Sequence, residues 1–488
     1  MHMNARRLAY CGILFTAFAG LAAERTQNFD SDPGWDGHNN RATRPEPRQI
    51  RQDFGYSRTS HAGGASGEMG GFISSVAEPA YYAKEIPTQT FNDSLSASGK
   101  LACPGREFHV LIAFFNDSTI NEWRTPNSIA LRLYGRGNVF YAYVEYCTSR
   151  WRAGGDWPTG FAMVSDPASG RERLKGFPAG TNVHRWSLKY DPTGNDGKGS
   201  VTATVGNETA VCHLAGGHKA DGATFNRFGL LNVMKQFDSG GEVWLDDVTI
   251  NGQTESFETD PHWSEFQNRH AYVTPIVRPR FDFGFSPTHY ASGKAKGEMG
   301  GMIYRGDGRY PHMMSFYGDR LAELTLDKPL RASGKICLRR GVSDSDVPFG
   351  FFHAEHSLNS GGSDRIGTPP DFIGFTVGGP SREGFYITPA YRVHDKETRT
   401  GGRGPSVYPD GKPHDWTFHY TPKAEGQSGG LIVVTLDKEE PITLELPPDH
   451  HKMGAHFNRF GLISTHTDGN AQHIYFDDLT YTWSQSQQ

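Results

Sequence analysis

Histidine, tyrosine and arginine side chains gather in the second half of the chain, where their types suit proton transfer beside a negative charge. Residues 385–394 read as a strand, and His353 follows another apolar segment. Arginine or histidine neutralises a carboxylate, whereas histidine and tyrosine accept and donate protons. Elimination from a uronic acid needs those roles, and we expect a catalytic group of His353, Tyr386, Arg392 and His394. The alternative is a polar surface rich in histidine.

A second set, rich in aromatic rings, lies in the first half. Side chains alternate along a strand, so residues 139–147 would place Tyr141, Tyr143 and Glu145 on one face. Aromatic rings stack on sugar rings, and arginine or glutamate bonds hydroxyl groups and carboxylates. The alternative is a half-buried sheet whose tyrosine hydroxyls reach solvent. We expect a saccharide groove lined by Arg132, Tyr134, Tyr141, Tyr143, Glu145, Arg150, Trp151 and Trp157.

Hydrolysis of a sugar linkage has weaker support. It needs two carboxyl groups about 5 to 9.5 Å apart. Glu68, Glu145, Glu298 and Glu355 are available, but no paired spacing singles out two of them. Signatures of serine or cysteine nucleophiles and of phosphate-binding glycine loops are absent. The sequence therefore favours elimination over hydrolysis and indicates no organic cofactor.

An internal repeat organises these residues. The offset between the copies is 228 residues at the start and 232 near the end. The order of the landmarks indicates a tandem duplication, with a signal segment at 1–23 and units at 24–252 and 253–488. The pattern favours closing each unit with its own opening and final strands. Residues 28–41 read again at 256–269, 53–57 at 282–286, 67–73 at 297–303, 97–100 at 332–335, 225–230 at 457–462, and 246–247 at 477–478.

Each unit is predicted to be all-β. Apolar and polar residues alternate at 201–205, 139–146 and 431–436, between turns rich in Gly, Asp, Asn and Pro. Many short strands in a unit of this size are typical of a two-sheet jelly roll. The chain holds 59 Gly and 29 Pro, which is high for a helical protein. We expect two tandem β-jelly-roll domains related by duplication.

The ends of the units carry a resemblance to a known superfamily. A Phe-Asp/Glu opening with a Trp six residues after the Phe, and a closing Asp-Asp pair, resemble the jelly rolls of concanavalin A-like, laminin-G-like and carbohydrate-binding domains. The resemblance implies secretion, a β-sandwich and often a structural Ca²⁺. The Glu-x-Asp-x-Glu strand of its glucanase members and the Tyr-Phe-Lys-Ala-Gly strand of its alginate-lyase members are absent.

Acidic residues at the ends of the units predict where Ca²⁺ would bind. Ca²⁺ takes six to eight oxygen ligands, and turn carbonyls would complete the shell. The alternative is that the acids only bond the backbone of Asp-Pro turns. We expect the ligands to come from Asp30, Asp32 and Asp247 in the first unit and from Glu258, Asp260 and Asp478 in the second.

Composition and charge limit the location and the partners. Residues 1–23 combine Arg6 and Arg7 with an apolar stretch and small residues, as secretory signals do. A net charge of −5 gives no general field for nucleic acid. No later segment is apolar for 18 residues, so we expect no membrane span. Cys103, Cys147, Cys212 and Cys337 remain, as one disulfide at most or as buried thiols.

Together these features predict a secreted or periplasmic protein that acts on an extracellular polysaccharide. Polysaccharide lyase is favoured over glycoside hydrolase. One alternative is a non-catalytic carbohydrate-binding protein that uses the aromatic face of the first unit. Another is a cell-surface adhesion or structural protein.

Overall fold

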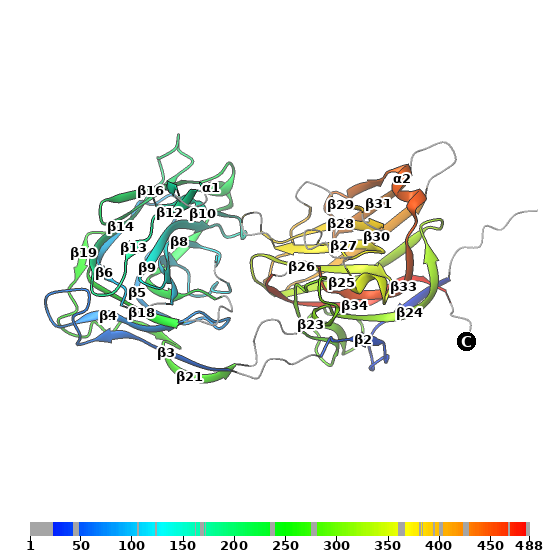
Figure 1. Cartoon of the computed structure of the whole chain (residues 1–488), viewed down its shortest axis with the longest axis horizontal. Helices are drawn as coiled ribbons and strands as arrows, with labels where there is room; N and C mark the ends of the chain where they lie inside the picture. Colours follow the sequence, from blue (N-terminus) through cyan, green and yellow to red (C-terminus); the bar gives the residue numbers. More distant parts are fainter. Residues whose placement is uncertain are drawn as a thin grey trace, which may run out of the picture.

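A computed structural model of the chain shows two β-sandwiches side by side (Figure 1). The predicted all-β class is confirmed, and the predicted signal segment lies outside the described residues except for Ala23. The structure describes residues 23–41, 48–104, 107–122, 124–161, 163–165, 170, 172–234, 240–274, 281–359, 367–379, 382, 384–393, 396–399, 404–422, 429–466 and 469–484.

The first sandwich consists of two antiparallel sheets. Its front sheet has the order β10 (Ala153–Gly160), β9 (Val139–Cys147), β8 (Ser128–Arg136), β7 (His109–Phe115), β17 (Thr224–Asn232), β5 (Tyr81–Thr90) and β20 (Ser264–Phe266), with β13 (Phe177–Pro178) paired to β9. Its back sheet has the order β16 (Glu208–His213), β15 (Ser200–Val205), β14 (Val183–Asp191), β6 (Leu95–Ala102), β18 (Gly240–Ile250), β4 (Glu68–Ser74), β3 (Arg48–Ser57) and β21 (Arg269–Thr274), with β19 (Gln253–Glu255) paired to β18. A separate hairpin joins β11 (Met163–Ser165) to β12 (Glu172–Leu174).

The second sandwich has the same two-sheet plan. Its front sheet has the order β2 (Asp36–His38), β24 (Phe316–Thr325), β33 (His456–Ile463), β26 (Ser345–Phe352), β27 (Phe372–Gly379), β28 (Tyr386–Val393) and β29 (Lys396–Arg399). Its back sheet has the order β22 (Asp282–Ser286), β23 (Glu298–Tyr304), β34 (Ala471–Trp483), β25 (Leu330–Gly341), β30 (Pro413–Pro422), β31 (Gly430–Leu436) and β32 (Ile442–Leu446), with β1 (Ala23–Gln27) paired to β34.

Helices are short and lie in connections between strands. They are α1 (His218–Asp221), α2 (Pro448–Met453) and the 3-10 turns η1 (Pro311–Met313) and η2 (His356–Leu358). Within the described part of the chain, no helix is long and apolar enough to cross a membrane. The four cysteines of the predicted mature chain, Cys103, Cys147, Cys212 and Cys337, are buried free thiols, which decides between the two alternatives for them.

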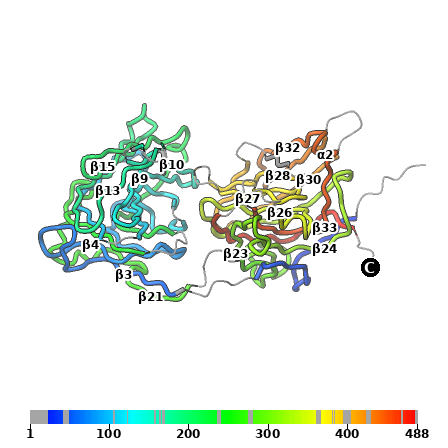
Figure 2. Tube along the Cα trace, in the orientation of Figure 1, coloured from blue at the N-terminus to red at the C-terminus, as the bar shows by residue number. Residues whose placement is uncertain are grey.

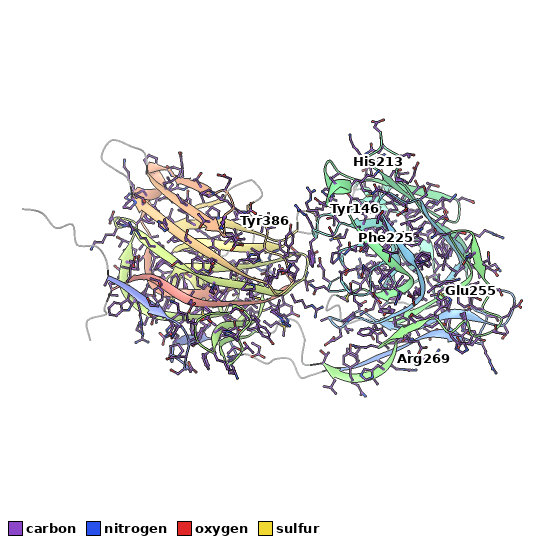
Figure 3. The ribbon with its side chains drawn as sticks, turned by 180° about the vertical axis from the view of Figure 1, so that it is seen from behind. Tyr146, His213, Phe225, Glu255, Arg269 and Tyr386 are labelled. Atoms are coloured by element: carbon purple, nitrogen blue, oxygen red, sulfur yellow. The ribbon has the colours of Figure 1, made fainter. Side chains whose placement is uncertain are left out.

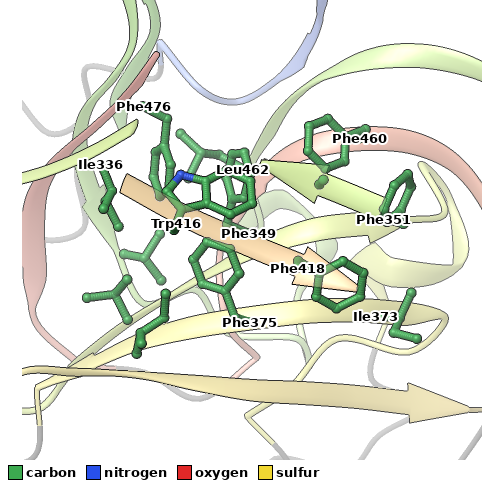
Figure 4. Packing of buried hydrophobic residues seen from close by; sticks show 14 of the residues in the cluster. Ile336, Phe349, Phe351, Ile373, Phe375, Trp416, Phe418, Phe460, Leu462 and Phe476 are labelled. Atoms are coloured by element: carbon green, nitrogen blue, oxygen red, sulfur yellow. The ribbon is translucent and has the colours of Figure 1, made fainter. Parts of the chain in front are cut away.

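Period-two alternation builds both cores. In β14 the buried positions are Trp186, Leu188 and Tyr190, and their neighbours on the strand face solvent or are half-buried. Polar residues on one face and apolar residues on the other are typical of antiparallel sandwich strands. In the second sandwich Trp416 packs against Phe349, with ring centroids 5.3 Å apart, and Figure 4 shows the phenylalanine cluster around this indole. Each sandwich therefore has its own aromatic core.

Each sandwich is completed by the opening segment of the other repeat. β1 pairs with β34 and β2 pairs with β24, so residues 23–38 belong to the second sandwich. In the reverse direction β20 pairs with β5 and β21 with β3, so residues 264–274 belong to the first. Figure 2 shows the N-terminal segment, in blue, lying with the second sandwich. The prediction that each unit closes with its own opening segment is wrong, and strand pairing does not follow the predicted boundary between 252 and 253.

Matching side chains hold the two exchanged segments. Asn40 donates to the carbonyl of Phe283 at 2.7 Å, and Asn268 donates to the carbonyl of Phe54 at 2.6 Å. The backbone N–H groups of Phe283 and Phe54 donate back to the same asparagines at 2.9 Å. The repeated Asn-Arg motif thus fixes each segment against the Asp-Phe-Gly strand of the other half. Each asparagine thereby satisfies both the N–H and the carbonyl group of the phenylalanine in that strand, and backbone polar groups need such partners when they are buried.

Candidate functional site

The candidate site lies on the outer face of the front sheet of the first sandwich, the face directed away from the core. Strand register places His109 opposite Tyr134, Tyr134 opposite Tyr141, and Arg132 opposite Tyr143. Glu145 lies on the same face, two residues beyond Tyr143. Alternate residues such as Leu131, Leu133, Phe140, Ala142 and Val144 belong to the core. The predicted grouping of the tyrosines with Arg132 and Glu145 is therefore present.

A network of charged and aromatic groups connects these side chains. Nε of Arg132 donates to Oε1 of Glu145 at 2.6 Å, and Nη1 of Arg132 contacts Nε2 of His109 at 2.9 Å. The guanidinium carbon of Arg132 lies 4.0 Å from the ring centroid of Tyr143. Nη2 of Arg124 lies 3.5 Å from the same oxygen of Glu145. Because arginine has no acceptor, Nε2 of His109 accepts this hydrogen bond.

The network is buried, whereas its tyrosine end is accessible. Arg132 is 4% exposed and Glu145 is 3% exposed. Removing either charge at this depth would destabilise the fold, because the other charge would remain buried without this partner. Tyr134 and Tyr141 are half-buried, and their rings stack with centroids 6.5 Å apart and planes inclined by 27°. The accessible part of the site is therefore a tyrosine platform with cations and an acid behind it.

Two further predicted groove residues, Arg150 and Trp151, do not join this platform. Trp151 adopts a left-handed backbone with φ of 56° and stacks on Tyr408 of the second sandwich, with ring centroids 5.7 Å apart. It also packs against the core of the second sandwich. Arg150 is exposed beside it. The side chain of Trp157 lies outside the described residues. Trp151 is thus a contact between sandwiches, which its place in a glycine-rich loop did not indicate.

Three residues of the first sandwich that the sequence interpretation omitted belong to the site or its support. They are His109, Arg124 and Glu122, and all are buried. His109 begins β7 as a lone polar residue of an apolar segment, so its register beside Tyr134 was the available signal. Arg124 and Glu122 lie in the loop between β7 and β8, where no periodicity predicts direction. Only the tertiary structure brings them to the network.

In the second sandwich the predicted catalytic residues Tyr386 and Arg392 do not lie together. Tyr386 and Arg392 lie on the same face of β28, but six residues separate them, which is about 20 Å along a strand. Arg392 is buried and donates to the carbonyl of Thr368 at 3.0 Å. Tyr386 lies toward the end of the sandwich that faces the first one (Figure 3). His394 lies outside the described residues. The predicted quartet is therefore not one site among the residues described.

His353 instead belongs to a histidine pair at the end of β26. Its Nδ1 accepts the backbone N–H groups of Glu355 and His356 at 3.3 and 3.2 Å, so it caps the turn. Its ring stacks on His356 at 4.0 Å, and Nδ1 of His356 lies 2.9 Å from Oδ2 of the buried Asp371. Burial, followed by the charge of His356, lowers the pKa of His353.

An open cavity of about 560 Å³ lies beside the histidine turn. Its wall includes Glu355 and Leu358 from the turn, and Asp36 and His38 from the exchanged segment. Asp36 is bonded by Arg320 at 3.0 Å and by Arg459 at 2.7 Å. His38 stacks on Phe316 with ring centroids 5.8 Å apart. The charged residues of the wall thus mainly hold residues 23–38 on the second sandwich.

The acids predicted to bind Ca²⁺ do not fit one site per unit. Asp30 and Asp32 lie in the segment that docks on the second sandwich, whereas Asp247 lies on the first. The ammonium group of Lys100 lies 2.5 Å from Asp247. Glu258 is exposed, and Asp478 accepts the N–H of Lys294 at 3.1 Å. The described residues contain no group of three or more His, Cys, Asp or Glu side chains arranged to hold a metal.

Turn formation accounts for two of these acids. Oδ1 of Asp32 accepts the N–H of Gly34 at 2.9 Å, and Oδ1 of Asp260 accepts the N–H of His262 at 2.9 Å. Such bonds from an aspartate to the backbone two residues later define an Asx turn. The observed contacts of Asp32 and Asp260 are therefore those of the alternative interpretation, in which the acids bond the backbone of Asp-Pro turns.

Comparison with known proteins gives no family assignment. No family model and no curated protein sequence matches the chain. Among solved structures, domains LG4–5 of the mouse laminin α1 chain share 11% identity with a TM-score of 0.22, covering 91% of this chain and 99% of theirs. An endo-β-1,4-glucuronan lyase from the fungus Trichoderma reesei shares 10% identity with a TM-score of 0.26, covering 47% of this chain and 95% of its own. An alginate lyase in complex with an alginate tetrasaccharide shares 8% identity with a TM-score of 0.25, covering 38% of this chain and 82% of its own.

Proposed function

We propose that the protein is secreted and binds and cleaves an acidic polysaccharide at the outer face of its first sandwich. The observation that carries this proposal is the accessible Tyr134–Tyr141 stack directly beside the His109–Arg132–Glu145 network. Tyrosine faces pack on sugar rings, and their hydroxyl groups bond sugar hydroxyls. Arginines near such a platform favour a sugar that carries a carboxylate.

The same residues can support β-elimination. Arg124 and Arg132 would stabilise the negative charge that develops when the uronate loses its C5 proton. Tyr143 would accept that proton in its phenolate form, which the guanidinium of Arg132 over its ring would stabilise, and would become a neutral phenol. The C4–O4 bond breaks as the C4–C5 double bond forms, and the proton passes from Tyr143 to the leaving oxygen. No external reactant is needed.

Binding without cleavage is the second candidate, and burial of the charges favours it. Arg132 and Glu145 already satisfy each other at 2.6 Å and are almost fully buried. A saccharide that reaches only the tyrosine stack would be held without being cleaved. The two candidates share the ligand class and differ in whether the substrate reaches Tyr143.

One screen separates these candidates. Purified protein is incubated with uronate-containing and neutral polysaccharides while absorbance near 235 nm and reducing ends are followed together. Lyase activity raises both signals, and Tyr143→Phe removes both while Tyr386→Phe in the second sandwich leaves them unchanged. Reducing ends alone would replace elimination with hydrolysis. Retention on a glycan gel without either signal would establish binding alone, and no retention on any glycan would contradict the proposal.

A further inference from the structure

The second sandwich holds the loop that brings Arg124 to the candidate site. This loop connects β7 to β8 and contains Asn121, Glu122 and Arg124. The N–H of Ser343, in the second sandwich, donates to Oε2 of Glu122 at 2.6 Å. Oγ of Ser343 donates to the same oxygen at 2.9 Å and lies 3.1 Å from Oε1. A buried carboxyl group from one sandwich is thus held by one residue of the other.

Two further contacts hold the same loop. Nδ2 of Asn121 donates to the carbonyl of Pro409 at 3.1 Å, and Nε of Arg340 donates to the carbonyl of Asn121 at 3.2 Å. The guanidinium of Arg340 also donates to the carbonyl of Ala77. The loop is therefore held at Asn121 and Glu122 by three residues of the second sandwich.

A short path connects Glu122 to the candidate site. Arg124 follows Glu122 by two residues, and its guanidinium lies 3.5 Å from Glu145. Glu145 in turn bonds Arg132 at 2.6 Å. A shift of the loop would move Arg124 relative to Glu145, and the buried pair would have to rearrange. The path runs along the backbone from Glu122 to Arg124 and then through side-chain contacts, and all of its side chains are buried.

The second sandwich does not repeat this network on its own face. Tyr146 and Tyr391 match, since each hydroxyl contacts Nδ1 of a histidine, His218 at 3.0 Å and His450 at 2.8 Å. Counting back from these tyrosines, Ala390 stands at the place of Glu145 and Thr388 at the place of Tyr143. The second sandwich thus has no counterpart of Glu145 or Tyr143 at these two positions, but it supplies the residues that hold the loop of the site.

We propose that Ser343 and Arg340 are positioning residues for the saccharide site of the first sandwich, acting through the loop that carries Arg124. The inference rests on the proposed function for its ligand. It assigns the second sandwich the role of a support that orders the site. Arg124 would lose its fixed place when Ser343 no longer grips Glu122.

The test uses the full chain and three variants. Ser343→Ala removes Oγ, Ser343→Thr keeps a hydroxyl group, and Tyr408→Leu alters the contact with Trp151 while it keeps every group that bonds the loop. Amide hydrogen exchange of residues 119–127 reports the loop directly. Binding of a uronate oligosaccharide and the separate values of kcat and KM report the site.

We expect faster exchange in the loop of Ser343→Ala only, with near-normal exchange in Ser343→Thr and Tyr408→Leu. In Ser343→Ala the affinity for the saccharide and kcat should each fall by up to about tenfold, because Arg124 lies beside the ligand and also stabilises the developing charge; this is the effect of losing one buried hydrogen bond. Unchanged exchange in Ser343→Ala, or equal loosening in Tyr408→Leu, would overturn the inference. Faster exchange with unaltered binding would also overturn it. If the unaltered protein binds no saccharide, the proposed function fails, while the exchange data still decide whether Ser343 holds the loop.

Discussion

The indole ring of Trp35 packs edge-on against the phenol ring of Tyr481, with centroids 6.1 Å apart. Trp35 opens the first repeat, whereas Tyr481 lies in β34, the last strand of the chain. The corresponding tryptophan of the second repeat, Trp263, stacks on Tyr82 of the first sandwich at 5.7 Å. Each core therefore contains a tryptophan from the opposite repeat, and neither half of the chain contains all of its own sandwich.

Replacing each exchanged tryptophan should weaken the opposite half. Trp35→Ala should destabilise the second sandwich and Trp263→Ala the first, each by about 3–5 kcal/mol, as large buried aromatic residues do when truncated. Both side chains are less than one-tenth exposed. Hydrogen exchange mapped along the chain would locate the weakened sandwich, and each variant serves as the control for the other. Loss of protection in residues 81–115 of Trp35→Ala, with the second sandwich intact, would contradict the strand exchange.

The carboxyl group of Glu122 should make stability depend on pH. Burial raises the pKa of Glu122 from its ordinary value of 4.5 to about 7, although Ser343, Arg124 and Arg340 act in the opposite direction. Between these values the folded protein holds a proton that the unfolded chain has lost. Stability from this group therefore falls as pH rises from 4.5 to about 7.

Comparison with Glu122→Gln isolates this contribution. Burial lowers the pKa of His466 from 6.5 to about 4, which gives a slope of opposite sign between these values and obscures the curve of the unaltered protein. The unaltered protein should lose stability relative to Glu122→Gln as pH rises, by on the order of 3 kcal/mol across the window. Denaturant unfolding at several pH values measures it. A constant difference would show that Glu122 is ionised throughout.

Chelation should leave the melting temperature unchanged. The described residues contain no group of acids arranged to hold a metal, and Asp247 is paired with Lys100 at 2.5 Å. Thermal melts with EDTA and with added Ca²⁺ measure the effect, and elemental analysis measures bound metal. Lys100→Ala provides a comparison in which the carboxylate loses its ammonium partner. A melting temperature that EDTA lowers and Ca²⁺ restores would contradict this account of the acids.

Local pattern predicted the sheet faces well, because side-chain direction along a strand repeats every two residues. That regularity is enough to group Tyr141, Tyr143 and Glu145 on one face and to align Arg132 with Tyr134. The same regularity did not show that Tyr386 and Arg392, which share a face of one strand, are too far apart along it to act on one substrate group. The pattern did not predict strand partners either, since both opening segments carry the same motif and the sequence does not specify which sandwich each segment joins. The loop around Glu122 has no periodic pattern, so nothing in the sequence indicated that Ser343 bonds Glu122.

The most direct test of the central claim is the affinity of the protein for uronate oligosaccharides, measured by calorimetry on matched tyrosine variants. Tyr141 and Tyr386 both stand five residues before a tyrosine that contacts a histidine, but only Tyr141 adjoins the charged network. Tyr141→Ala should weaken binding about tenfold through the loss of one aromatic stacking contact, and Tyr386→Ala should bind as the unaltered protein does. Equal affinities for Tyr141→Ala and the unaltered protein, or a loss confined to Tyr386→Ala, would contradict a saccharide site on the first sandwich.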